Sequence, residues 1–467
     1  MVRRPDQLDA LHGAVRSADR IAIDTETPID GPLAGRMRVM SIAVRGPDGE
    51  QAFVVDARDL DPTLLAPILT GVTADAWNAA FDARVIDAAV WDSADTTTGI
   101  TWWDAQLADA LLHQGRSGFT WYHGLAWATS HYLGIEADGK GTVQLSYTAH
   151  DDLTDEQIEY AAADAVHTLW VADAVRAEIG SARLDEICAV EQAARPFLDR
   201  MERTGLPFDW DGWKTELEAI DTDRRQTLGR LALLTGGGQG TLFDEVVEPN
   251  WNPASDMQVR QILNQWAETE VRAWTERRHG SPRLLDDGDS VRAGVLREIG
   301  GPLCEELLHH RDLAKILSTY GESIGEHLDD GRIRPQYLQV VGTNTGRLAS
   351  VNPNAQNFTP RMKPHIRPKD GRVFVHADLS QAELRYLAQV ADDAPLREAF
   401  ARGDDVHVGT AASMFGFDPE ALRETDPDRF KRLRQIAKAL NFGIAYGAGA
   451  ASLGRSLTAE GNPTTTE

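Results

Sequence analysis

The spacing of apolar residues changes along the chain and divides it into parts of different character. Three short apolar runs near the N-terminus predict β-strands, at residues 20–26, 37–46 and 51–57. Apolar positions then recur at helical spacing in three further segments, residues 79–90, 104–113 and 154–178. Strands first, with helices around them, predict an α/β sandwich for this part of the chain.

The pattern is mainly helical from residue 186 onwards. The run LDEICAVEQAARPFLDRMERTG, residues 184–205, predicts one long amphipathic helix that Gly205 ends as a C-cap. The run GGGQG at residues 236–240 predicts a flexible loop, and residues 302–328 predict a pair of helices.

Strand-like runs return from residue 336, and helices follow them. The stretch GRVFVHADLS, residues 371–380, predicts a strand because its apolar residues lie between a glycine and polar residues. Residues 381–391 and 429–447 predict two further helices.

The charge of the chain is strongly acidic, with a formal net charge of −25. This argues against a nucleic-acid partner, because phosphate binding usually shows as a basic surface. Positive charge is concentrated locally, however: residues 429–438 carry five Lys or Arg and no acid, and residues 361–372 carry five against one acid. Each basic segment is open to two interpretations, a phosphate-binding surface or an ordinary solvated face.

Cysteine content and the lack of long apolar runs indicate a cytoplasmic protein. Cys188 and Cys304 lie in apolar helical surroundings without the spacing of a zinc site or a disulfide framework. The N-terminus has no apolar segment of a signal peptide. No uninterrupted apolar run reaches the ~18 residues of a membrane span, so we expect no membrane partner.

Carboxylates occupy positions that favour metal binding in the N-terminal part. Asp24 and Glu26 come at the end of the strand-like run IAIDTE and share one face of a strand, where two negative charges repel unless a cation lies between them. Asp82 follows Asn78 by four residues on a predicted helix. Carboxylate oxygens are the ligands that Mg²⁺ prefers.

A second helix adds Tyr160 and Asp164, which are one turn apart and therefore on the same side. Two ions about 3.5–4 Å apart would stabilise the attacking and leaving oxygens of a phosphodiester, and a tyrosine hydroxyl would orient the attacking water. Taken singly, each motif has a simpler interpretation: D-x-E as a solvated turn and Y-x-x-x-D as a hydrogen-bonded pair.

The ordered set D-T-E, N-x-x-x-D and Y-x-x-x-D resembles the three motifs of the DEDD-type 3′–5′ proofreading exonucleases, in their tyrosine variety. The resemblance implies a ribonuclease-H-like domain over residues 1–185 with two metal ions in its active site, Mg²⁺ or, since oxygen ligands accept it too, Mn²⁺. It also implies five catalytic residues, of which all but the tyrosine bind metal: Asp24, Glu26, Asp82, Tyr160 and Asp164.

The C-terminal part carries a second set of candidate residues. Asp378 ends the strand-like run VFVHAD, and an acid there must be solvated, paired or metal-bound. Ser380 and Glu383 have the spacing of a capping box, which would explain both without catalysis. On the last helix four residues recur at intervals of four along one face, two cations for phosphates and two aromatics for a base: Arg434, Lys438, Phe442 and Tyr446.

Four runs in order, TNTGRLASVNPNAQNFTP, DLSQAELR, DVHVGTA and RQIAKALNFGIAYG, resemble the family A DNA polymerases of the bacterial DNA polymerase I type. The resemblance implies a partial right-hand polymerase with a connecting helix and helical thumb over residues 186–335 and an incomplete palm and fingers over residues 336–467. It implies that Asp378 binds the catalytic metal ions, two per active site, and that the following residues bind nucleotide or DNA: Arg347, Gln381, Glu383, His407, Arg434, Lys438, Phe442 and Tyr446.

The family's second palm carboxylate, in a His-Asp-Glu turn, has no counterpart after Gly447. The sequence therefore predicts a DNA-directed DNA polymerase with 3′–5′ proofreading, active in replication or repair on a DNA primer-template with deoxynucleoside triphosphates. Its polymerase site is expected to be truncated after the fingers helix, or completed by a separate polypeptide. The alternative is a 3′–5′ exonuclease whose polymerase-like region grips DNA without catalysis. Complete exonuclease motifs argue against a third interpretation, a non-catalytic primer-template binding module.

Overall fold

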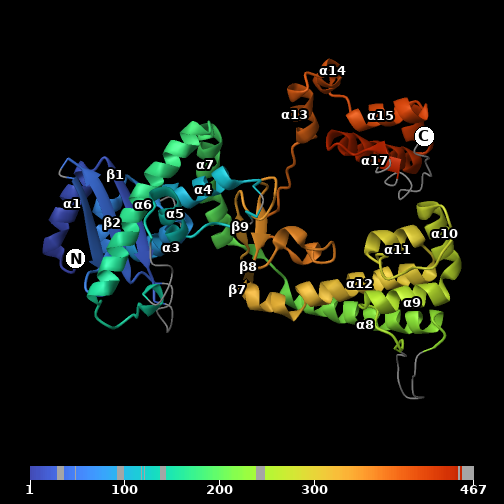
Figure 1. Ribbon diagram of the computed structural model, residues 1–467, viewed down its shortest axis with the longest axis horizontal. Helices are drawn as coiled ribbons and strands as arrows, with labels where there is room; N and C mark the ends of the chain where they lie inside the picture. The colour runs from blue at the N-terminus through green and yellow to red at the C-terminus, as the bar shows by residue number, and fades with distance from the viewer. Residues whose placement is uncertain are drawn as a thin grey trace. The chain divides into compact units, whose positions relative to one another are not determined.

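The computed structural model describes residues 1–28, 36–47, 49–91, 99–116, 118–119, 121–136, 143–237, 248–450 and 453–454. The chain forms two compact units, each assembled from two separate segments. Figure 1 shows the helices and strands coloured in order from the N-terminus to the C-terminus. The first unit joins Met1–Lys214 to Glu322–Arg367, and the second joins Thr215–Gly321 to Pro368–Glu467. No described helix is both long enough and apolar enough to cross a membrane.

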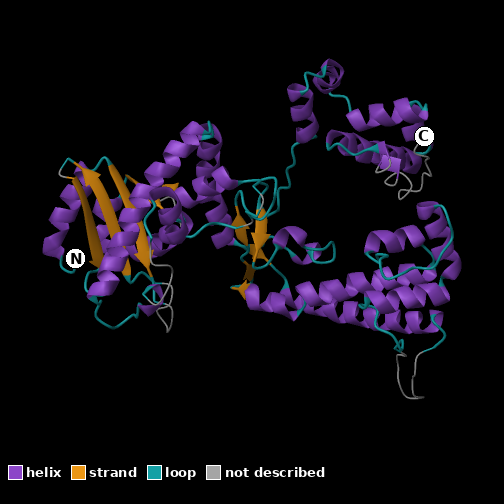
Figure 2. Cartoon of the chain, viewed as in Figure 1, coloured by secondary structure: helices purple, strands orange, loops and turns teal. Residues whose placement is uncertain are grey.

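A five-stranded mixed sheet forms the centre of the first unit (Figure 2), in the order β3-β2-β1-β4-β5. β1 pairs antiparallel with β2 and parallel with β4; β2 pairs antiparallel with β3, and β4 parallel with β5. The strands are β1 (Arg20–Glu26), β2 (Val39–Gly46), β3 (Gly49–Asp56), β4 (Val72–Ala76) and β5 (Ile100–Asp104). The predicted α/β class and its first three strands are confirmed.

Helices cover both faces of this sheet, and the alternation of β1 decides which residues they meet. Ile21 and Ile23 face the side covered by the helices α1 (Leu8–Ser17), α2 (Ala66–Leu69) and α3 (Ala79–Val90). Ala22 faces the other side, where it packs with Ala43 of β2 against α6 (Asp155–Ser181). Side chains this small let α6 lie close to the sheet.

The first unit contains further helices and two smaller sheets, of order β10-β9 and β6-β8-β7. They are α4 (Ala105–His113), α5 (Leu125–Leu133), α7 (Asp185–Thr204), β6 (Leu206–Pro207), β7 (Leu328–Asp329), β8 (Arg332–Ile333), β9 (Gln336–Leu338) and β10 (Ala349–Val351). The antiparallel pair of β9 and β10 packs on α4 through an apolar cluster that contains Leu107, Ala110 and Val341. The helix predicted to end at Gly205 is confirmed as α7.

The second unit is helical throughout its described elements, and its apolar side chains form separate clusters. One cluster spans Leu231 to Leu307. The helices that precede Glu322 are α8 (Trp210–Leu234), whose start up to Lys214 belongs to the first unit, α9 (Asp256–Trp266), α10 (Glu268–His279), α11 (Ala293–Ile299) and α12 (Pro302–Tyr320). Those of the second segment are α13 (Ala382–Val390), α14 (Ala394–Arg402), α15 (Val406–Phe415), α16 (Pro419–Thr425) and α17 (Pro427–Ala445).

Two predictions about this unit are wrong. Residues 302–328 form one helix followed by a 3₁₀ turn at Glu322–His327 rather than a helix pair. Residues 371–380 form no strand, and the side chains of Val373 and Val375 are 81% and 87% exposed. A strand needs a neighbour for its backbone hydrogen bonds, and no described segment pairs with this one. Of the predicted loop 236–240, residues 238–240 lie outside the described residues.

Gly205 gives a test of how α7 ends. Its φ of +62° is in the region that favours glycine, and a Cβ would lie 2.7 Å from the carbonyl oxygen of Ile333. We expect Gly205→Ala to lower the free energy of unfolding by roughly 1–3 kcal/mol, measured by urea denaturation. The control is Gly13→Ala on α1, where a Cβ meets nothing within 4 Å. An equal effect of both variants would contradict this account of the cap.

Candidate active site

Three carboxylates meet where β1 ends beneath α6. Asp24 and Glu26 continue the face of β1 that Ala22 turns towards α6, and Asp164 comes from α6 itself. Their ligand oxygens lie within 4.8 Å of one another, and Glu26 is only 5% exposed. Three hard oxygen donors at this separation fit a divalent cation, which would also offset their mutual repulsion.

Tyr160 lies one turn before Asp164 on α6 and is half-buried. Burial raises the pKa of its hydroxyl, and the negative charge of Asp164 and a hydrogen bond to that carboxylate raise it further. The phenol therefore keeps its proton at neutral pH and is able to donate it in a hydrogen bond. Nearby, the buried Tyr147 donates its hydroxyl to the carbonyl oxygen of Gln157 at 2.8 Å.

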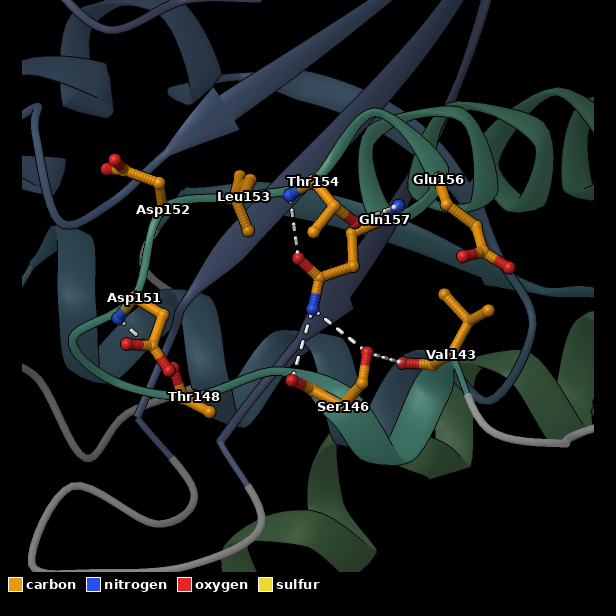
Figure 3. A pocket seen from close by; sticks show the side chains of 9 residues that line it. All are labelled: Val143, Ser146, Thr148, Asp151, Asp152, Leu153, Thr154, Glu156 and Gln157. Carbon is orange, nitrogen blue, oxygen red and sulfur yellow. Dashed lines mark hydrogen bonds between the residues drawn. The ribbon is translucent and has the colours of Figure 1, made fainter.

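The start of α6, which carries Tyr160 and Asp164, is held in place by side-chain hydrogen bonds. Thr154 and Gln157 form a reciprocal capping box, with Gln157 N donating to Thr154 Oγ1 at 3.2 Å and Thr154 N donating to Gln157 Oε1 at 2.9 Å. Gln157 Nε2 also donates to the carbonyl oxygen and the Oγ of Ser146, at 3.1 and 2.9 Å. Figure 3 shows these bonds beside a cavity of about 310 Å³.

Asp82 does not belong to the group of three carboxylates with ligand atoms within 4.8 Å of one another. It is 2% exposed, and its Oδ1 accepts a hydrogen bond of 2.7 Å from Thr25 Oγ1. Thr25 lies between Asp24 and Glu26 on β1, so its side chain points to the other face of the strand. Asp82, which belongs to α3, bonds to Thr25 on that face. Burial raises the pKa of Asp82 to about 7, and the negative charge of Asp104 raises it as well.

The predicted nucleotide-binding residues of α17 contact two other helices. Tyr446 Oη donates to Glu383 Oε2 of α13 at 2.7 Å. Arg434 Nε donates at 2.8 Å to Asp405 Oδ2, at the start of α15. Lys438 lies exposed on the same helix. Side-chain bonds therefore connect α17 to α13 near its C-terminal end and to α15 along its length.

His407 and Phe442 also connect α15 to α17. The rings have centroids 5.8 Å apart, and Asn441 Nδ2 lies 3.1 Å from His407 Nδ1. Burial lowers the pKa of His407, and the nearby charges of Arg434 and Lys438 lower it further while Asp405 opposes them. His407 is therefore neutral at pH 7 and accepts a proton only in more acidic solution.

Three other candidates lie outside these bonded groups. Asp378 is exposed in the segment that forms no strand. Gln381 begins α13 with a φ of +56° and no capping hydrogen bond, so the predicted capping box of Ser380 and Glu383 does not form. Arg347 is exposed in the first unit, on the connection between β9 and β10.

Sequence reasoning missed several residues that hold the candidates in place. Thr25 lies inside the D-T-E motif, but its role depends on which helix covers its face, and no local pattern states that. Asp405 caps α15 by accepting hydrogen bonds from the backbone of His407 and Val408, at 3.0 and 3.2 Å. An aspartate before a helical run was the available signal for this cap.

Two family models match the chain. The model described as DNA polymerase family A matches residues 241–465, and the model described as 3′–5′ exonuclease matches residues 1–179. The DNA polymerase I of Chloroflexus aurantiacus is 30% identical over 482 residues, which cover 98% of this chain and 48% of that relative. The chain thus spans about half the length of this relative.

Two other relatives are also named DNA polymerase I. The DNA polymerase I of Aquifex aeolicus is 26% identical over 92% of this chain and 69% of its own length. The thermostable DNA polymerase I of Thermus filiformis is 38% identical over 36% of this chain and 20% of its own length. The fold is similar to that of the POL domain of Pol1 from M. smegmatis, which was solved in complex with DNA primer-template and dNTP. The TM-score is 0.72 and the sequence identity is 22%, and the match covers 97% of this chain and 72% of that one.

The hydrogen bond between Thr25 and Asp82 gives a pH-dependent prediction. Because the pKa of Asp82 is raised in the folded chain, the stability that its protonated form contributes is lost as pH rises through about 7. Thr25 counteracts this loss by bonding to the carboxylate. We expect Thr25→Val to cost about 1 kcal/mol of unfolding free energy at pH 5 and about 2–3 kcal/mol at pH 9.

The measurement is urea denaturation without divalent cations at both pH values. Thr73→Val, at an exposed position of β4, is the matched control and should change stability little at either pH. A loss for Thr25→Val that is the same at pH 5 and pH 9 would contradict the assignment, since the bond would then not involve an ionised carboxylate.

Proposed function

Since the chain belongs to DNA polymerase family A and carries a 3′–5′ exonuclease domain, we propose that it is a proofreading DNA polymerase chain that removes nucleotides from the 3′ end of DNA. Its substrates would be a DNA primer-template and deoxynucleoside triphosphates. That a separate polypeptide completes the palm stays a prediction.

One observation carries the exonuclease assignment, the convergence of Asp24, Glu26 and Asp164 within 4.8 Å. These carboxylates would hold Mg²⁺ or Mn²⁺, and Asp82, bonded to Thr25 in the structure, is the fourth carboxylate of the proposed set. Bound divalent ions supply Lewis-acid stabilisation of phosphate oxygens and a more acidic water at such a site.

The protein's own groups contribute orientation and proton control. Tyr160 keeps its hydroxyl proton because burial and Asp164 raise its pKa, so its oxygen would position a water at the scissile phosphate. The close approach of α6 to the sheet keeps that hydroxyl beside the carboxylates. A fixed geometry of this kind lowers the barrier by removing the need to order the reacting groups.

We further propose that α17 and its neighbours bind the incoming nucleotide. Arg434, Lys438 and His407 would contact the triphosphate, while Phe442 and Tyr446 would lie against the bases. Support comes from the bonds that bring Tyr446 to Glu383 and Arg434 to Asp405. The other proposed contacts are the metal ligand Asp378 and the DNA-binding residues Gln381 and Arg347.

The second candidate function is a 3′–5′ exonuclease whose polymerase-like part grips DNA without extending it. The observation that favours it is the contrast between the two proposed metal sites. The carboxylates at β1 already lie together, whereas Asp378 is exposed in a segment without a strand. Metal-assisted phosphoryl transfer requires a rigid, closely placed ligand set.

Primer shortening tests the exonuclease. We expect the chain with Mg²⁺ to shorten a 5′-labelled primer on its template, and Asp24→Ala/Glu26→Ala to reduce the rate by roughly 10³-fold or more, because both carboxylate ligands of one strand are removed. The measurement is single-turnover cleavage resolved on a denaturing gel. Asp9→Ala, at an exposed carboxylate of α1, is the control and should leave the rate unchanged.

The same assay with the four deoxynucleotides separates the two candidate functions. Extension that disappears in Asp378→Ala supports a polymerising chain, and shortening without extension supports the exonuclease alternative. Shortening that survives Asp24→Ala/Glu26→Ala would mean that the carboxylates of β1 are not the nuclease site.

Nucleotide binding tests α17. We expect Lys438→Ala to weaken the binding of a deoxynucleoside triphosphate about tenfold, because an exposed ammonium opposite phosphates is lost. The measurement is equilibrium titration of the chain with a fluorescent nucleotide. Lys431→Ala is the control, since it removes the same charge from an exposed position of the same helix. Equal weakening by both substitutions would indicate general charge attraction and no specific site.

A further inference from the structure

A second group of possible metal ligands lies away from the carboxylates of β1, where α4 ends and α5 begins. Asp109 and His113 belong to α4, and His123 lies on the connection that leads to α5. One ligand atom from each of the three lies within 4.8 Å of the others. None of these residues belongs to the proposed nuclease or nucleotide site.

The buried carboxylate of Asp109 is the centre of this group. It is 0% exposed, and its Oδ1 accepts a hydrogen bond of 2.7 Å from Tyr132 Oη. Its Oδ2 lies 2.8 Å from His123 Nδ1, and its Oδ1 lies 3.2 Å from His113 Nδ1. A fully buried carboxylate requires compensation by positive charge, and its ion-pair partners among the described residues are these two imidazoles.

Aromatic stacking fixes the orientation of the imidazoles. The ring of His123 stacks on Trp127 with centroids 3.5 Å apart and an interplanar angle of 20°. The ring of His113 meets that of His123 edge-on, at 4.8 Å and 89°. Rings held in this way present their nitrogens without further loss of side-chain entropy, which is the condition for a preorganised site.

We propose that Asp109, His113 and His123 bind a divalent transition-metal ion of the Zn²⁺ class. Two imidazole nitrogens and one carboxylate oxygen suit Zn²⁺ and its neighbours better than Mg²⁺, which prefers oxygen ligands alone. Three protein ligands leave one tetrahedral position for water. His113 Nδ1 also lies 2.9 Å from the carbonyl oxygen of Asp109, so binding of the ion at Nδ1 requires that each ring carry its proton on Nε2 and that the ion replace these hydrogen bonds.

The ion would strengthen a contact that the chain also makes through an apolar cluster and through polar bonds. The connection between α4 and α5 reaches the segment around β9 and β10 through Gln114 Nε2, which donates to the carbonyl oxygen of Thr343 at 3.0 Å. Tyr122 Oη on the same connection donates to the carbonyl oxygen of Gln339 at 2.7 Å. A metal held by residues on both sides of Gln114 therefore stabilises this contact as well as α4.

The test is titration of the chain with Co²⁺ and with Zn²⁺ in excess Mg²⁺, which would compete for the proposed oxygen-only carboxylate site. We expect Co²⁺ to give the visible absorption of a nitrogen-ligated, low-symmetry ion at one equivalent, and Zn²⁺ to raise Tm by roughly 3 °C or more. His113→Ala/His123→Ala should abolish both effects. His131→Ala is the matched control. Like His123, His131 stacks on Trp127, with ring centroids 4.5 Å apart, but it does not belong to the ligand group.

Each outcome decides the proposal. Absence of the Co²⁺ absorption and of the Zn²⁺-dependent Tm rise in the wild-type chain would overturn it, and the contacts of Asp109 with Tyr132 and the two imidazoles would then be purely structural. Equal loss in His131→Ala would also overturn it. If the double variant fails to fold, His123→Gln keeps the ring's volume and polarity in part, and retained Co²⁺ absorption in that variant contradicts the ligand assignment. Because Asp24 and Glu26 take no part, failure here leaves the nuclease proposal intact.

Discussion

The close packing of α6 on β1 and β2 is the constraint on which the proposed exonuclease site depends. Ala22, Ala43 and Ala165 meet at this interface and are each at most 1% exposed. Because their side chains are single methyl groups, the helix backbone lies near the strand backbone. Asp164, adjacent to Ala165, is thereby brought to the end of β1, where Asp24 and Glu26 occupy the same face as Ala22. A larger residue at any of these alanines would move the helix and separate the carboxylates.

This arrangement exchanges stability for function. Three carboxylates with ligand atoms within 4.8 Å repel one another in the absence of a cation, and Glu26 is almost fully buried. The folded chain offsets that cost elsewhere in the same unit, through the core between the sheet and α1 to α3 and through the capping box at Thr154. In the proposed site, a bound divalent cation would remove this repulsion as well as form new contacts.

The sequence predicted those features that depend on local pattern. Strand alternation placed Asp24 and Glu26 on one face, and the helical spacing of Tyr160 and Asp164 placed both on one side of α6. The short strands β4 and β5 were missed because VTADA and ITWWD lack clear apolar alternation over their five residues. The place of Asp82 could not be predicted either, since it depends on α3 covering the face of Thr25, which is a long-range choice. For residues 371–380 the error is the reverse, since the local pattern predicted a strand that the structure does not contain. A strand signal is not sufficient when no described segment pairs with it.

The predicted nucleotide-binding face of α17 is already occupied by bonds within the protein. Arg434 bonds to Asp405, which in turn caps α15, and Tyr446 bonds to the exposed Glu383. Although burial raises the pKa of Asp405, its bond from Arg434 lowers the pKa below the ordinary value, so Asp405 is ionised at neutral pH. A triphosphate that binds Arg434 must therefore compete with a charged partner, and its binding would free Asp405 to cap α15 alone. The ion pair holds the guanidinium near the helix face, which reduces the entropy that binding costs. To displace the carboxylate of Asp405 from Arg434, an incoming anion must carry more negative charge than one carboxylate. A triphosphate meets this condition.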